Sequence, residues 1–175
     1  MRKGLLIAVL LAGGLAAGTL RTALAASDTW ITTKAKIALL TTDGSGGSAV
    51  NVDTVDGKIT IHGKVKTEAE KTKAASTVRT IDGVTEVKNL LQFVPEAERK
   101  MVKASDNEIK DKVSAALKAD PTLESASVKV ASVNDGVVLL SGKAKTLSQK
   151  LTAIESAHRV AGVRKVSSEI ESDEK

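Results

Sequence analysis

VDGKITIHGKVKT, residues 55–67, decides the fold of this chain, because a closely similar stretch, NDGVVLLSGKAKT, follows at residues 134–146. Each copy contains an Asp-Gly pair, then apolar residues at every second position, then a glycine, two lysines and a threonine. An Asp-Gly pair next to alternating apolar residues predicts a tight hairpin turn and a strand. The chain is therefore predicted to be a tandem repeat.

The repeat extends beyond the hairpin, and its register shows where the copies differ in length. Residues ahead of the turn match residues 78 positions later, and residues after the turn match residues 79 positions later. One residue has therefore been inserted beside the second turn, which is where a hairpin tolerates an insertion. The matched residues of the first copy are Ser27, Asp28, Ile31, Leu39, Val50, Val52, Gly57, Gly63, Thr67, Gly83, Val84 and Val87.

Each copy is predicted to form a helix, two strands, a second helix and a last strand. In the first copy, apolar spacing predicts a helix over residues 27–40, a hairpin closed by the Asp-Gly pair, and a strand over residues 84–94. Thr67 and Glu70 fit the capping box that opens the second helix. Glycines predicted to lie at structural turns are Gly57, Gly63, Gly83, Gly136, Gly142 and Gly162.

The second copy has its own start signal, because Ser105 and Glu108 form a capping box that predicts the first helix of that copy. Pro95 opens a charged segment that is predicted to be a linker or a short lead-in helix. We therefore expect two α+β units at residues 27–94 and 105–171, a linker at residues 95–104 and a tail at residues 172–175.

The first 25 residues have the order of a secretory signal. Arg2 and Lys3 precede a mostly apolar run at residues 5–20, and small residues precede a predicted cleavage after Ala25. An uncleaved membrane anchor is the alternative, but the run is shorter than the roughly 20 apolar residues that span a bilayer. Because no cysteine is available to be acylated, we expect a soluble exported protein and not a lipoprotein.

Charge and aromatic content argue against a nucleic-acid partner. Three of the 26 basic residues leave with the predicted signal, so 23 remain against 21 acidic residues, and the net charge falls from +5 to +2. Nucleic-acid binding calls for a clustered basic face with aromatic residues for stacking. This chain has one Trp, one Phe and no Tyr.

No pattern in the sequence predicts catalysis, a metal site or a cofactor. The chain has no cysteine, no Gly-x-Ser-x-Gly elbow and no carboxylate pair that the expected fold brings together. His62 and His158 are expected to be solvated. The Gly- and Ser-rich residues 41–48 lack the lysine and the following helix of a phosphate-binding loop. We therefore expect a protein that is not an enzyme.

IDGVTEVKNL, residues 81–90, follows a hairpin of the Gly-x-apolar-x-apolar-x-Gly type. With this apolar-Gly-Val pattern each unit resembles a BON domain, and two units behind a signal peptide resemble the osmotically inducible periplasmic protein Y group. The resemblance implies an α-β-β-α-β fold with two helices on one face of a small mixed three-stranded sheet. It also implies a periplasmic role in osmotic or envelope stress, through phospholipid binding or as a chaperone-like protein. The second copy departs at Ser168, where the first has Asn89.

Lys64, Lys66, Lys143 and Lys145 are candidates for binding the head groups of an anionic phospholipid surface. Each pair lies at a strand end ahead of a helix N-terminus, which itself favours anions. At an anionic surface each lysine contributes about 1 kcal/mol, so the four together give only about millimolar affinity. Solvated strand ends without a ligand are the alternative.

Trp30 is the candidate that could add an apolar contact to such a surface. Its counterpart in the second copy is Glu108, so an indole stands where the repeat predicts an exposed charge. A large aromatic side chain on a polar helix face suggests contact with a membrane interface or another surface. Packing against the chain end or the other unit is the alternative.

Val137 and Leu139 make both faces of one strand apolar in the second unit, where the first unit has Lys58 and Thr60. One face of this strand packs on the helices of its own unit. The other face is predicted to be either the contact between the units or a site for a partner such as an envelope protein or an unfolded client.

Overall fold

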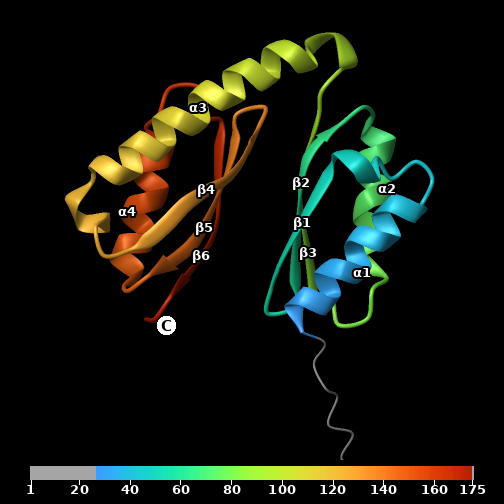
Figure 1. Cartoon of the computed structure of the whole chain (residues 1–175), viewed down its shortest axis with the longest axis horizontal. Coiled ribbons are helices and arrows are strands. Elements are labelled where there is room, and N and C mark those ends of the chain that lie inside the picture. The colour runs from blue at the N-terminus through green and yellow to red at the C-terminus, as the bar shows by residue number, and fades with distance from the viewer. Residues whose placement is uncertain (1–26, 175) are drawn as a thin grey trace, which may run out of the picture.

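The computed structural model of the chain describes residues 27–174. The predicted signal peptide and its cleavage after Ala25 lie outside the described residues. Two α+β units follow one another, each with two helices and a mixed three-stranded sheet, as Figure 1 shows. The fold class predicted from the sequence is thereby confirmed.

The two units have the same order of elements. The first consists of α1 (Asp28–Thr41), β1 (Val50–Val55), β2 (Lys58–Val65), α2 (Glu68–Arg79) and β3 (Glu86–Phe93). The second consists of α3 (Arg99–Ala119), β4 (Ser127–Asn134), β5 (Val137–Ala144), α4 (Leu147–His158) and β6 (Lys165–Ser172). Short 3-10 turns lie at Gly47–Ala49, Glu96–Glu98 and Pro121–Leu123.

The hairpin turns have the backbone that their sequence demands. Asp56 and Gly57 have φ values of 51° and 74°, and Asp135 and Gly136 have values of 49° and 71°. Two successive positive φ angles make the two-residue turn that matches the twist of an antiparallel hairpin. The middle strand of each sheet then pairs antiparallel with the strand before it and parallel with the last strand.

Gly63 and Gly142 mark a close approach between strands. Their φ angles are 138° and 121°, in the region that side chains disfavour. A Cβ on Gly63 would overlap the carbonyl oxygen of Ala49, and one on Gly142 would overlap that of Ser127. The repeated glycine after the apolar strand is thus required by the backbone of the neighbouring strand. Gly83 and Gly162, after the second helix of each unit, also have positive φ angles.

The predicted caps of the second helices form in both units. Thr67 Oγ1 accepts the backbone N–H of Glu70 at 3.0 Å, and Glu70 Oε2 accepts the N–H of Lys66 at 2.7 Å. The carboxylate thus reaches one residue further back than in a standard capping box. Thr146 and Gln149 repeat both contacts: Thr146 Oγ1 accepts the N–H of Gln149 at 3.1 Å, and Gln149 Oε1 accepts the N–H of Lys145 at 2.9 Å.

The predicted start of the first helix in the second unit is wrong. Helix α3 begins at Arg99, so Ser105 lies inside it and caps nothing. Residues 99–104 are arginine, lysine, methionine, valine, lysine and alanine, and nearly all of these favour helices. Without a glycine or proline to stop it, the predicted lead-in helix merges with α3, which begins inside the predicted linker.

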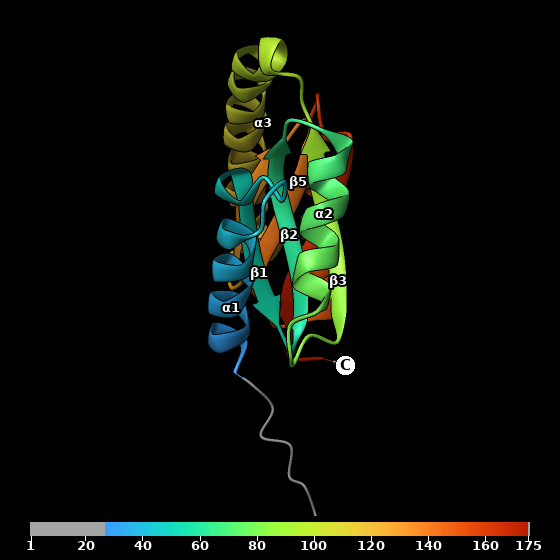
Figure 2. The same cartoon turned by 90° about the vertical axis from the view of Figure 1, so that its right-hand side faces the viewer.

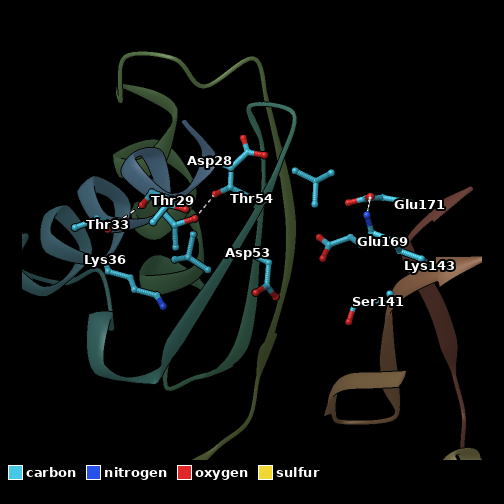
Figure 3. A pocket seen from close by; sticks show the side chains of 14 residues that line it. Asp28, Thr29, Thr33, Lys36, Asp53, Thr54, Ser141, Lys143, Glu169 and Glu171 are labelled. Carbon is cyan, nitrogen blue, oxygen red and sulfur yellow. Dashed lines mark hydrogen bonds and ion pairs between the residues drawn. The ribbon is translucent and has the colours of Figure 1, made fainter. Parts of the chain in front are cut away.

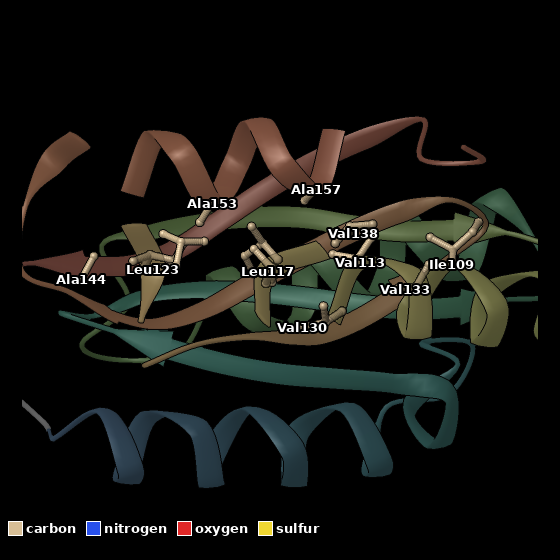
Figure 4. Packing of buried hydrophobic residues seen from close by; sticks show 12 residues of the cluster. Ile109, Val113, Leu117, Leu123, Val130, Val133, Val138, Ala144, Ala153 and Ala157 are labelled. Atoms are coloured by element: carbon tan, nitrogen blue, oxygen red, sulfur yellow. The ribbon is translucent and has the colours of Figure 1, made fainter. Parts of the chain in front are cut away.

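Each unit has its own apolar core between its sheet and its helices. The core of the first unit contains Ile31, Leu39, Ile61 and Leu91, among others. The core of the second unit is shown in Figure 4, where side chains of α3, α4 and the sheet meet in one layer. Val138 and Leu140 belong to that core, and their neighbours Val137 and Leu139 do not.

The two sheets face one another, and the helices lie on the outer sides (Figure 1). Figure 2 looks onto α1 and α2, which cover the near face of the first sheet, with the second unit behind it. None of the helices between residues 27 and 174 combines the length and the apolarity that crossing a bilayer requires.

Candidate functional site

Three of the four candidate lysines lie at the surface. Lys66 and Lys143 are exposed and form ion pairs with Glu96 at 3.6 Å and with Glu171 at 3.4 Å. Lys145 is exposed as well. Because exposed ion pairs contribute little, Lys66 and Lys143 can exchange their carboxylate partners for another anion at small cost.

Lys64 joins the two units. Its Nζ lies 2.7 Å from Asp106 Oδ2, and the two side chains are only 19% and 4% exposed. The same carboxylate accepts the backbone N–H groups of Asp135 at 2.9 Å and Gly136 at 3.0 Å. One aspartate therefore holds α3, the β4–β5 turn and the first unit together, and Lys64 is not free to meet a head group.

Asp28 is the counterpart of Asp106 in the repeat. It binds the hairpin turn of its own unit but does not link the two units. It accepts the backbone N–H groups of Asp56 and Gly57, both at 2.9 Å, and so holds the turn of its own unit. No lysine pairs with it among the described residues. Sequence comparison matched the two aspartates but gave no sign of their contacts, because both turns lie about 30 residues further along the chain.

Val137 and Leu139 lie on the face of their sheet that is turned toward the first unit. They are 6% and 1% exposed although they belong to neither core. Leu90, on the facing side of the first sheet, is also buried outside the cores. The sequence left two alternatives for this face, a contact between the units or a site for a partner, and in the structure it forms the contact between the units. A partner could reach these residues only if the units separated.

His62 is buried between the sheets, so the expectation that it is solvated is wrong; the second sheet covers its side of the first. Its Nε2 lies 2.9 Å from Asp53 Oδ2. Because an ionised carboxylate only accepts, Nε2–H is the donor, and this hydrogen bond lowers the pKa of Asp53. Nδ1 is buried and has no partner among residues 27–174.

Glu169 faces this pair from β6 of the second unit. Its burial between the sheets raises its pKa, and the nearby charge of Asp53 adds to the effect. Contacts with Thr60, Lys88 and His62 oppose the rise only in part. An ionised Glu169 therefore costs free energy when the units are packed together.

We expect Glu169→Gln to raise the melting temperature at neutral pH. A carboxyl whose pKa is raised in the folded state stabilises that state below the pKa of the unfolded chain and loses this effect as the pH rises through the folded value. The advantage of the glutamine should therefore shrink as the pH falls through the raised pKa of the folded state, and it should be lost below about 4.3, the usual glutamate pKa. Thermal unfolding from pH 3 to pH 8 measures it, and an advantage that grows toward low pH would contradict the assignment.

A cleft of about 580 Å³ opens between the units beside these residues. Figure 3 shows Asp53 and Lys36 on one wall and Glu169 and Lys143 on the other. The lining is mostly hydroxyl, carboxylate and ammonium groups, without an aromatic ring. No group of three or more side chains in residues 27–174 could hold a metal ion. The cleft therefore offers water-exposed polar contacts but no apolar anchor.

The outer face of α1 is the largest departure from the polar surface that the repeat predicts. Trp30, Ile37 and Leu40 are 54%, 57% and 68% exposed. At 100° per residue they fall on the side of the helix opposite the buried Ile31, Ala35 and Leu39, so α1 is apolar on both sides. The sequence analysis identified Trp30 alone, because Ile37 and Leu40 were not compared with their counterparts in the second copy.

Two lysines border this face. Lys34 Nζ lies 5.4 Å from the centre of the Trp30 ring, which is within the range of a cation–π contact. Lys36 lies on the opposite side of the apolar stripe, by helical spacing. We call Trp30, Lys34, Lys36, Ile37 and Leu40 the α1 face.

The second unit serves as an internal comparison. The positions equivalent to Trp30, Ile37 and Leu40 are Glu108, Ala115 and Lys118. Glu108 there forms an ion pair with Lys112, the counterpart of Lys34, at 2.7 Å. The same helix position in the same fold is thus polar in one unit and apolar in the other, so the fold does not require an apolar α1 face.

The match to a family model agrees with the duplicated architecture. The BON domain model matches residues 27–95 and again residues 105–173. Osmotically-inducible protein Y of Escherichia coli (strain K12) is 33% identical over 145 residues, which covers 82% of this chain and 71% of that protein. CdsD, a structural protein of the type III secretion system of Chlamydia trachomatis, aligns with 10% identity and a TM-score of 0.33 over 82% of this chain and 92% of that one.

Proposed function

The chain belongs to the BON domain family, and from that premise we propose that it binds anionic phospholipid surfaces of the cell envelope under osmotic stress. The α1 face is the observation that carries the proposal. It is a helix surface with a tryptophan and two aliphatic side chains in the middle and a lysine on each side. This is the arrangement by which a helix lies in the head-group region of a bilayer. The predicted signal peptide supports an envelope location.

The proposed affinity is weak. Each lysine near an anionic surface contributes about 1 kcal/mol. Each apolar side chain of the face still has 54–68% of its surface exposed, so its further burial contributes roughly 1 kcal/mol, a little over half of the lower value for full burial. Together these give about 5 kcal/mol, which corresponds to a dissociation constant of a few tenths of a millimolar. The exposed Lys66, Lys143 and Lys145 can add to it only where they reach the same surface.

Ile37→Glu is expected to weaken binding to anionic vesicles at least tenfold, because it removes an apolar contact and adds a repelled charge. The measurement is co-flotation of the chain from residue 26 with vesicles of increasing phosphatidylglycerol content, at low and physiological salt. Binding by the parent should rise with anionic lipid and fall with salt.

Ala115→Glu is the matched control for this experiment. It introduces the same glutamate at the equivalent exposed position of α3 and should leave flotation unchanged. Equal flotation of both variants and the parent would remove the α1 face from the proposal. A parent that floats with no lipid composition would refute phospholipid binding as a whole.

A holdase or adaptor that uses Val137 and Leu139 is the alternative function. The burial of both residues between the sheets means that the units would first have to separate. The partly polar contact, with Asp53, His62 and Glu169 in it, is of a kind that can open more readily than an apolar core.

A further inference from the structure

The second unit contains a groove that reaches its apolar core from the outside. The groove has a volume of about 440 Å³ and lies between the C-terminal half of α3, the Pro121–Leu123 turn and the edge strand β4. Leu117, Leu123 and Val130 form its floor, and Figure 4 shows these three side chains within one layer of the core. Ala126 and Val128 continue the apolar lining.

The equivalent place in the first unit is closed. The floor residues of the groove keep 5–9% of their surface exposed, whereas their counterparts Leu39, Ser45 and Val52 keep 1–3%. Ser45 donates a hydrogen bond to the carbonyl of Leu39, and Gly47 packs so closely on that carbonyl that a Cβ would overlap it. These two contacts hold the loop after α1 against the end of the helix. The loop after α3 has Leu123 and Ser125 at the two equivalent positions and makes neither contact.

The charges around the groove also differ from those in the first unit. Lys118 and Lys129 line it from the helix and from the strand, where the first unit has Leu40 and Asn51. Glu124 is the one acidic residue in the lining against two lysines. Of these, Lys129 also helps to lower the pKa of Asp53 in the first unit, so Lys118 is the cation at the mouth of the groove. An apolar floor with a positively charged rim suits a ligand that has an apolar chain and an anionic end.

We propose that this groove binds the chain of a dissolved single-chain amphiphile with an anionic head group, such as a fatty acid. The chain lies along Leu117, Leu123 and Val130, and the carboxylate meets Lys118 at the mouth. The volume falls within the range of known small-ligand sites and is too small for both chains of a phospholipid together with its head group. The site is independent of the α1 face, which lies on the other unit.

The test is isothermal titration calorimetry of the protein with sodium dodecanoate, at dodecanoate concentrations below the critical micelle concentration. We expect one molecule per chain, and at least tenfold weaker binding of dodecyltrimethylammonium, which has the same tail and the opposite charge. Lys118→Glu should weaken dodecanoate at least tenfold, because it reverses the charge at the mouth. Lys110→Glu, the same change two turns earlier on α3, should not.

Ala126→Phe tests the apolar part, because a phenyl ring placed there fills the groove. It should abolish dodecanoate binding with the melting temperature unchanged or higher, and it should leave flotation with anionic vesicles intact. Unchanged dodecanoate affinity in a folded Ala126→Phe protein overturns the proposal. So does equal binding of the cationic amphiphile, or binding only above the micelle concentration. Loss of flotation with retained dodecanoate binding in Ile37→Glu would show that the two sites are separate.

Discussion

Replacing Asp106 with alanine is expected to lower the free energy of unfolding by about 3 to 5 kcal/mol, the usual effect of breaking a buried ion pair. The substitution leaves the ammonium group of Lys64 and two backbone N–H groups of the β4–β5 turn without their acceptor. Buried donors without partners are the costly part of such a change. Urea denaturation followed by circular dichroism measures the loss, and hydrogen exchange of residues 127–144 reports on the turn itself.

Asp28→Ala is the control that the repeat supplies. It removes the same two contacts with the turn of the first unit, but no lysine, at a less buried position, so a loss of about 1–2 kcal/mol is expected. Lys64→Met should have little further effect once Asp106 is alanine, because both changes remove one interaction. Equal losses for the two aspartates, or additive losses for Lys64 and Asp106, would mean that the ion pair does not hold the units together.

Much of the fold could be predicted because its signals are local and occur twice. The Asp-Gly turns, the caps at Thr67 and Thr146 and the strand periodicity each depend on residues a few positions apart. The misplaced helix start at Ser105 shows the limit of such signals. A capping box predicts a helix start only where the residues ahead of it cannot continue the helix, and residues 99–104 can.

The candidate site was harder to predict because it depends on packing between distant segments. Lys64 resembles Lys143 in sequence, yet one is held by a buried aspartate and the other lies in solvent. His62 was expected in water, the default for a histidine without a candidate metal or nucleophile partner, and it is the opposite sheet that buries it. A comparison of all exposed helix positions between the two copies would have found Ile37 and Leu40, because their counterparts are Ala115 and Lys118.

Asn89 shows how the copies diverge at a shared position. In the first unit its side chain donates to the carbonyl of Lys71 in α2 at 3.2 Å and accepts the N–H of Leu91 at 3.0 Å. Ser168 in the second unit keeps only the second type of contact, with the N–H of Ile170 at 3.2 Å. The shorter side chain retains the local bond and loses the bond to the helix, so the asparagine is not required by the fold.

Leu139→Asp is expected to separate the two units while each remains folded. The side chain is 1% exposed between the sheets, and an unpaired carboxylate there costs several kcal/mol unless water reaches it. Separation of the units lets water reach the carboxylate. The second unit should stay folded, because its core uses Val138 and Leu140 from the same strand and not Leu139. Small-angle scattering should show a larger radius of gyration with unchanged far-ultraviolet circular dichroism. Lys145→Asp, which introduces the same carboxylate at an exposed position after β5, should change neither.

The same variant also decides whether separation of the units is functional. If the face with Val137 and Leu139 binds unfolded clients, Lys64→Met should increase suppression of client aggregation, because it weakens the contact between the units and leaves the face apolar. Leu139→Asp weakens the contact as well but places a charge on the face, so it should suppress less than the Lys64 variant does. Equal suppression by both variants would mean that clients bind elsewhere. Loss of secondary structure in Leu139→Asp would instead show that the sheet contact is part of the fold of each unit, and that the alternative function has no accessible surface.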